Sequence, residues 1–253
     1  MKKIFLIFIV FYFSFLSAYD FSMINLINPS GLDAKQAELM IRHRFYGDIT
    51  DEPLDNFLGM DAGANVNLSA RYQFIRNAEL KLGYSRRKSE KTLGASYKIE
   101  IDDFPIIGQV GLDYFSYEEV SQPETTRRNI FPYFALQNEE VIDRLVATIN
   151  TGFDGYNERF VLGAGLTVRI LDNMSLLFEY YPVLDRDSAS DELAFYLGEE
   201  DAYSFAIKFD TYGHQFTFLL SNTDNIGIRR CSLGAEKDSY LHLGFNIQRR
   251  LEW

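Results

Sequence analysis

Three histidines, His43, His214 and His242, are the residues to consider first for catalysis. A serine hydrolase needs a histidine base beside its nucleophile and a third group that orients the base. No serine is spaced to pair with His43 or His214, and His242 shares a strand face with Asn246, which suits a structural hydrogen-bond network. The sequence therefore predicts no catalytic residue and no enzyme activity.

An acidic run, DRDSASDE at residues 185–192, offers the oxygen ligands that calcium prefers. A calcium loop needs glycine at its sharp turn, where this run has Ser190. We interpret the run as a solvated acidic loop. The sequence predicts no metal site and no cofactor, and its single cysteine, Cys231, excludes a disulfide within the chain.

The alternation of apolar and polar residues is more informative than either of these candidate sites. In GANVNLSARYQF, residues 63–74, one set of alternate positions is wholly apolar and the other wholly polar. This pattern recurs along the chain and predicts about twelve strands, most of the length that a tilted membrane strand needs. The strands are separated by connections that alternate between short turns and longer loops, as in outer-membrane barrels.

These features predict an all-β fold, a single closed antiparallel transmembrane β-barrel of about twelve strands in an up-and-down meander. The sheet must close because unpaired backbone groups are costly in hydrocarbon. The apolar face of each strand should then contact lipid, and the polar face should line the lumen.

The first 18 residues have a basic start, an apolar stretch and a small residue, Ala18, as in a signal peptide. We expect residues 19–253 to form the barrel in the outer membrane of a Gram-negative bacterium, with both termini periplasmic. The final residue, Trp253, partly matches the C-terminal signal read by the barrel-assembly machinery. The net charge of −11 argues against a nucleic-acid partner, so outer-membrane lipids and small solutes are the expected partners.

Strand parity assigns charged side chains to the lumen. The basic candidates for a pore or a plug are Arg71, Lys81, Lys98, Arg144, Arg169 and Lys208, and parity adds Arg42, Arg44 and Arg250. The acidic ones are Glu79, Asp113 and Glu179, with Glu38 and Asp210. Two interpretations stay open: a cationic pore, or paired charges that plug a narrow barrel. Residues 20–35 are a further candidate for a plug.

Several stretches resemble a bacterial family of membrane-bound β-barrel domains of unknown function. They include HRFYGD, LGYSRRKSEKTLGASYK, LGAGLTVRILDNMSLLFEYYPVL and GHQFTFLLSNT, and they lie between His43 and Arg250. The resemblance implies the barrel fold and the membrane location, and it assigns no catalytic or binding residues.

The function expected from the sequence is a channel or facilitator for small solutes, with anions favoured by the basic lumen. The alternative is a structural or ligand-binding barrel that does not transport and that displays acidic extracellular loops.

Overall fold

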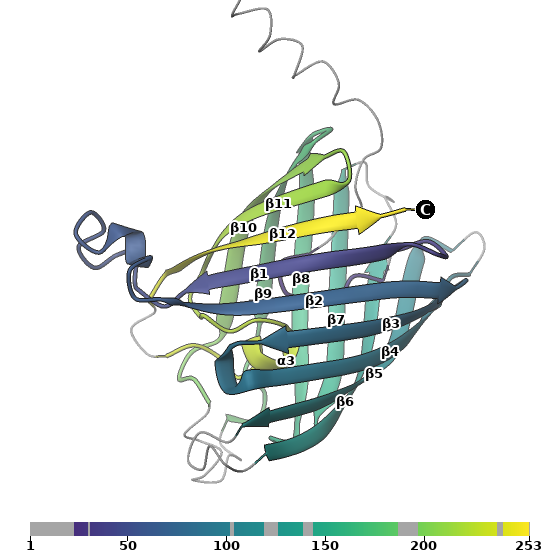
Figure 1. Ribbon diagram of the computed structural model, residues 1–253, viewed down its shortest axis with the longest axis horizontal. Coiled ribbons are helices and arrows are strands. Elements are labelled where there is room, and N and C mark those ends of the chain that lie inside the picture. Colours follow the sequence, from purple (N-terminus) through teal and green to yellow (C-terminus); the bar gives the residue numbers. More distant parts are fainter. Residues whose placement is uncertain are drawn as a thin grey trace, which may run out of the picture.

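The computed structural model describes residues 23–29, 31–101, 104–118, 126–138, 144–186, 197–236 and 240–252. In this part of the chain, twelve strands form one closed barrel, and each strand is antiparallel to both neighbours (Figure 1). The barrel closes where β1 pairs with β12, with Ala37 opposite Leu251. The strands are β1 (Ala37–Phe45), β2 (Ala64–Ile75), β3 (Ala78–Ser85), β4 (Glu90–Ile99), β5 (Ile106–Glu118), β6 (Thr126–Asn138), β7 (Leu145–Asp154), β8 (Arg159–Leu171), β9 (Met174–Tyr181), β10 (Ala202–Thr211), β11 (His214–Ser221) and β12 (His242–Leu251).

Alternation determines the facing of each strand, as the sequence predicts. On β2, Leu68 is 48% exposed while Asn65 is 2% exposed. Large apolar side chains are exposed all around the outer wall, including Leu112 on β5, Ile149 on β7 and Phe218 on β11. Such a wall suits lipid, because a membrane barrel carries its apolar band outside and its polar residues inside.

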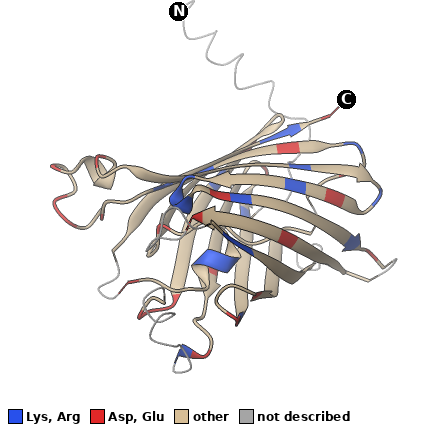
Figure 2. Cartoon of the chain, turned by 60° about the horizontal axis from the view of Figure 1, so that its bottom comes forward, with Lys and Arg blue, Asp and Glu red and all other residues tan. Residues whose placement is uncertain are grey.

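The two ends of the barrel differ. Short connections, such as residues 76–77, 172–173 and 212–213, join strands at the end where β1 begins and β12 ends, here called the short-turn end. Longer connections lie at the opposite, long-loop end, and Figure 2 shows Asp and Glu on several of them. The β1–β2 loop contains the short helix η1 (Phe57–Gly59) and folds on itself, since a Cβ on Gly59 would lie 2.4 Å from the carbonyl oxygen of Gly47.

Two segments occupy the interior of the barrel. The first, residues 23–29, is here called the inner segment, and Ile24 and Leu26 within it are 0% and 3% exposed. The second, residues 222–236, follows β11, folds in from the long-loop end and carries the helix α3 (Ile228–Cys231); it is here called the inner loop (Figure 1). The interior is therefore filled by packed chain as well as by charged side chains.

These segments explain why the alternation is weak in the middle of the sequence. Part of the inward face of β5 and β6 is apolar: Phe115, Tyr117, Phe131 and Tyr133 are all buried in one cluster with Met23, Leu26 and Ile228. The outward side chains of β6 are apolar as well because they face lipid. Pro132 pairs opposite Leu112 of β5, whereas the ladder from β6 to β7 begins one residue later, at Tyr133, so its missing N–H is tolerated.

Among the described residues, no helix is long and apolar enough to cross a membrane. Residues 1–18, residues 187–192 of the acidic run and Trp253 lie outside the described part of the chain. The signal peptide, the solvated loop and the assembly signal accordingly stay predictions.

Candidate functional site

The inner segment is held in place chiefly by Glu179 of β9. Its fully buried carboxylate accepts backbone hydrogen bonds from Ile24 (2.7 Å), Asn25 (2.9 Å) and Leu26 (3.1 Å), and one from the Tyr181 hydroxyl at 2.5 Å. A buried carboxylate needs donors of this kind, because an unsatisfied one carries a large desolvation cost. Glu179 thus binds the backbone of the inner segment and fixes it inside the barrel.

The inner segment and the inner loop enter from opposite ends of the barrel and meet at Asn25. The Asn25 Oδ1 accepts hydrogen bonds from the backbone N of Gly227 and from the Arg44 guanidinium, both at 3.2 Å. Arg44 and Ile24 in turn bind Asn246 of β12, at 2.9 Å each. The contact point is therefore tied to the barrel wall on two strands.

The inner loop is fastened to the wall by an ion-pair cluster. The Glu90 carboxylate, at the start of β4, accepts hydrogen bonds from Arg229 and, at 2.6 Å, from Arg230. Arg229 also lies 3.7 Å from Asp154 and 4.0 Å above the ring of Phe115. Burial disfavours the guanidinium charge, but the carboxylates of Glu90 and Asp154 outweigh it and raise the pKa of Arg229. The arginine therefore stays charged inside the barrel.

The two interior segments leave open space along β1 to β5. An inner cavity of about 140 Å³ lies deep in the lumen, and an outer cavity of about 860 Å³ lies below the long loops. Four residues line both cavities: Asn67, Glu90, Ile226 and Arg230. These four form the neck between the cavities. Since Glu38 and Glu79, at the short-turn end, line the inner cavity, the two cavities together follow the length of the barrel.

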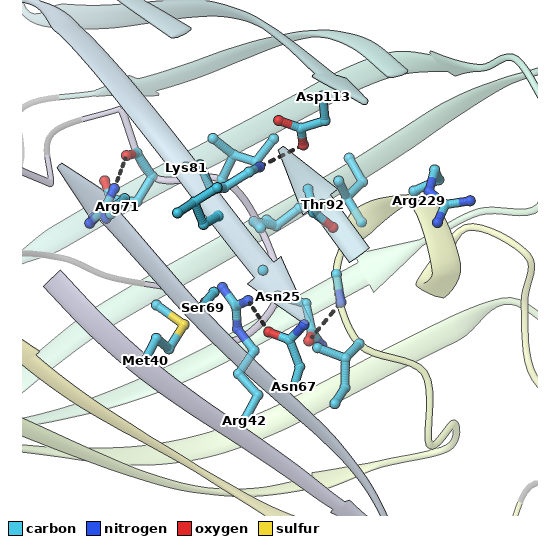
Figure 3. Close-up of a pocket in the computed structure, with 18 of the residues that line it drawn as sticks. Asn25, Met40, Arg42, Asn67, Ser69, Arg71, Lys81, Thr92, Asp113 and Arg229 are labelled. Carbon is cyan, nitrogen blue, oxygen red and sulfur yellow. Dashed lines mark hydrogen bonds and ion pairs between the residues drawn. The ribbon is translucent and has the colours of Figure 1, made fainter. Parts of the chain in front are cut away.

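Charged side chains line the inner cavity, and most of them are paired (Figure 3). Arg71 lies 2.8 Å from Glu38 and 3.5 Å from Glu79. Lys81 lies 2.5 Å from Asp113. Arg42 differs, since its one hydrogen bond among the described residues goes to the Asn67 amide oxygen at 3.4 Å. The lining of the inner cavity thus combines paired charges, as in the plug interpretation of the sequence, with one arginine, Arg42, that forms no ion pair among the described residues.

The structure gathers only part of the residues chosen by parity. Six of them share the inner cavity: Glu38, Arg42, Arg71, Glu79, Lys81 and Asp113. The others on strands face the lumen elsewhere: Lys98 pairs with Glu100 at 2.8 Å, Lys208 is 1% exposed, Glu179 holds the inner segment, and Arg169 lies on the same face of β8 as the buried Thr167. The role of these side chains, as the lining of a pore or as a plug, stays a prediction.

Arg144 lies outside the lumen wall, contrary to its parity assignment. It is exposed, has a φ of +72° and donates a hydrogen bond to the carbonyl of Ile170 at 3.3 Å. The strand β7 begins at Leu145, so Arg144 belongs to the preceding connection, where alternation no longer determines facing.

The histidines occupy three different environments. His43 stacks on Phe245 with ring centroids 4.8 Å apart, and Nδ1 of His214 lies 3.3 Å from the carbonyl oxygen of Tyr212. His242 lines the outer cavity, and its Nδ1 lies 3.1 Å from the carbonyl oxygen of Phe45. Within the described ranges, no group of three or more His, Cys, Asp or Glu side chains could hold a metal ion.

Sequence reasoning missed Asn25, Glu90, Arg229 and Arg230. Parity assigns side chains only on strands, whereas Asn25 and the two arginines come from chain that folds into the barrel. The signal that was available is the apolar inward face of β6, at Phe131 and Tyr133, because a water-filled lumen would not require it.

Comparison with known proteins supports the membrane barrel. The family model described as membrane bound beta barrel domain (DUF5777) matches residues 21–104 and 127–251. No curated protein matches the chain in sequence.

Among solved structures, the KdgM porin in complex with disordered oligogalacturonate is similar at 10% identity and a TM-score of 0.56, covering 85% of this chain and 99% of the porin. The Acinetobacter baumannii outer membrane protein Omp33 is 10% identical, with a TM-score of 0.46 and coverage of 86% and 98%. The Escherichia coli outer membrane phospholipase A is 8% identical, with a TM-score of 0.46 and coverage of 85% and 90%. At such identities the KdgM similarity establishes the fold alone, and the two lower scores carry no argument.

Proposed function

We propose a transport function for this chain, which belongs to the membrane bound beta barrel domain family (DUF5777). The protein acts as an outer-membrane facilitator for small solutes, with a preference for anions. The observation that carries the proposal is the pair of cavities along β1 to β5, which share four lining residues and follow the length of the barrel.

The neck sets the size of the solutes. Asn67, Glu90, Ile226 and Arg230 separate an outer cavity of about 860 Å³ from an inner cavity of about 140 Å³. Ile226 is the apolar member and belongs to the inner loop, so a shorter side chain there widens the neck without removing a charge. Five basic and four acidic side chains line the inner cavity, and a basic excess inside a low-dielectric wall attracts anions.

In this proposal residues 1–18 are a signal peptide, and the short-turn end, with both termini, faces the periplasm. The last strand is recognised by the barrel-assembly machinery. A cysteine-free background with single cysteines at Asn173 or at Asp55, labelled in whole cells by a membrane-impermeant reagent, tests the orientation. Labelling at position 55 alone supports it, and labelling at position 173 alone refutes it.

The transport test is conductance in planar bilayers, after a gel has shown the folded barrel by its altered mobility before boiling. We expect a small conductance with an anion-biased reversal potential that weakens as salt screens the lumen. Ile226→Ala should increase the conductance, whereas Ile149→Ala, on the lipid face, should leave it unchanged. A folded barrel without conductance, or one that selects cations, contradicts the proposal.

A second candidate function is a ligand-binding barrel that does not transport. The filling of the lumen by the inner segment favours it, since Glu179 and Asn246 hold this segment by hydrogen bonds to its backbone. Binding without conductance, in the native chain and in Ile226→Ala alike, would favour this function over transport.

A further inference from the structure

We propose that the inner cavity is a binding site for a small carboxylate that carries an apolar body about the size of one ring. This proposal names the class of solute for the cavity of the proposed transport function. Passage of the ligand through the barrel rests on that function, whereas binding in the cavity does not depend on conductance.

The charge that selects the carboxylate is Arg42 of β1. All four carboxylates that line the cavity are engaged with other cations: Glu38 and Glu79 with Arg71, Asp113 with Lys81, and Glu90 with Arg229 and Arg230. Among the described residues Arg42 forms no ion pair, and its Nε is buried without a hydrogen-bond partner. No carboxylate of the described chain thus lies within ion-pair distance of Arg42, and a carboxylate ligand would supply one with bidentate geometry.

Further polar groups of the cavity lie near Arg42. Figure 3 shows Asn67, Ser69 and Asn25 around the Arg42 side chain. The Nδ2 of Asn25 is buried and lacks a hydrogen-bond partner in the described chain. A carboxylate at Arg42 would place acceptor oxygens where these unused donors are, and buried donors favour occupation because leaving them unpaired is costly.

The inner cavity also has an apolar part. Phe115, Phe131 and Tyr133 contribute aromatic rings from β5 and β6, and Met23 and Leu26 contribute side chains from the inner segment. These groups are buried against one another, with Phe131 1% exposed. An inorganic anion would make no apolar contact with these lining groups, whereas an apolar body attached to the carboxylate would pack against them.

The volume sets the size of that body. The cavity measures about 140 Å³, and a cavity of about 150 Å³ in another protein holds one benzene molecule. A single-ring acid therefore matches the space, and benzoate is the simplest probe. Benzamide has nearly the same shape without the charge, and acetate has the charge without the ring.

The experiment is calorimetric titration of the full-length barrel in neutral detergent and low-chloride buffer with these three probes. We expect benzoate to bind, and benzamide and acetate to bind about tenfold more weakly or not at all, since a charge-assisted hydrogen bond and a buried ring each contribute at least about a tenfold factor.

Three variants assign the effect to Arg42. Arg42→Gln should lower benzoate affinity about tenfold and leave that for benzamide unchanged, and Arg42→Lys should recover part of the loss. The control variant is Arg169→Gln, which removes an arginine that faces the lumen from β8 but lines neither cavity. This variant should bind benzoate with the affinity of the native chain. Altered gel mobility before boiling shows that each variant is folded.

Equal affinity for benzoate and benzamide, or unchanged benzoate binding in Arg42→Gln, overturns the proposal. If Arg42→Gln does not fold, the native chain's preference for benzoate over benzamide and the response of Arg42→Lys still decide it. Binding in detergent without conductance in bilayers would refute the transport function alone, and conductance without benzoate binding would refute this ligand class alone.

Discussion

Arg71 on β2 and Lys81 on β3 lie directly opposite each other in the sheet, although both are cations. Like charges at such positions are destabilising. Each is compensated on its far side, Arg71 by Glu38 of β1 and Lys81 by Asp113 of β5. A row of four charges, in the order acidic, basic, basic and acidic, thereby crosses the wall of the inner cavity from β1 to β5, with Gly94 of β4 between Lys81 and Asp113.

This row predicts that Asp113→Asn destabilises the barrel by about 2 kcal/mol, because Lys81 loses a hydrogen bond to a charged group and then faces Arg71 without its carboxylate. Urea unfolding in detergent, followed by tryptophan fluorescence or by gel mobility, measures the change in the free energy of unfolding. Adding Lys81→Met to Asp113→Asn should recover most of the loss. Equal stability of the single variant and the native chain would show that the pairing is energetically neutral.

Glu179→Gln should loosen the inner segment, because an amide presents donors toward backbone N–H groups that the carboxylate accepted. Hydrogen exchange at Ile24, Asn25 and Leu26 should become faster. The control is Asp210→Asn, an acid on β10 whose contact is with Gln215 and not with the inner segment. Unchanged protection at these amides in Glu179→Gln would contradict the assigned role.

Cys231 makes the inner loop observable without engineering. The thiol is 0% exposed, and burial raises its pKa, so it should react slowly with maleimide in the folded barrel. Glu90→Gln weakens the ion-pair cluster that holds Arg229 and Arg230, and it should accelerate labelling. Glu118→Gln, which lines the outer cavity without joining that cluster, should label at the native rate.

Lys88 should give the outer cavity a pH dependence. Burial, followed by the charges of Arg230 and Arg87, lowers the pKa of Lys88 to about 8. The lysine loses its charge as pH rises through about 8, so anion preference should fall between pH 7 and 9. Lys88→Met should remove this dependence, whereas Lys91→Met, at an exposed lysine nearby, should retain it.

The same lowered pKa has a defined effect on stability. A base whose pKa is lower in the folded than in the unfolded state is less protonated when folded, so the free energy of unfolding rises with pH from about 8 to the ordinary lysine value of about 10.4. Comparing the urea midpoints of native chain and Lys88→Met across this range checks the sign.

The two faces of β2 should respond differently to charge. Leu68→Arg places a cation on the lipid face and should lower stability by about 2–4 kcal/mol if it lies near the midplane. Asn67 is the adjacent residue and faces the neck between the cavities, so Asn67→Arg should lower stability less than Leu68→Arg does. Yields of folded, heat-modifiable barrel compare the two variants, and equal yields would mean that the facing of β2 is misassigned.

The strands and their facing could be predicted from the sequence because period-2 alternation is a local property. Residues such as Leu68 and Asn67 carry the information for their own orientation. Lys81 and Asp113 lie on the inward faces of their strands for this reason. Their contact could not be predicted, because parity gives the face of a residue and not which neighbour its side chain reaches.

The interior segments could not be predicted in the same way. Asn25 and Gly227 are about two hundred residues apart, and neither lies on a strand, so no periodic pattern links them. The assignment of Arg144 to the lumen was wrong for a related reason, because this residue precedes β7 by one position and alternation does not extend to it. Tertiary contacts, and not alternation, determine the positions of these residues.

The location of the inner segment constrains how the chain assembles. Its carbonyl at Ile24 is bound by Asn246, 222 residues later, and its backbone amides bind Glu179 of β9. The segment is synthesised before every strand, yet its partners are among the last to be made. Once the seam between β1 and β12 forms, hydrogen-bonded strands surround the segment, and no lateral route remains. After closure the segment can enter only along the barrel axis, through the short-turn end, and contacts of such long sequence separation make its docking a slow step in folding.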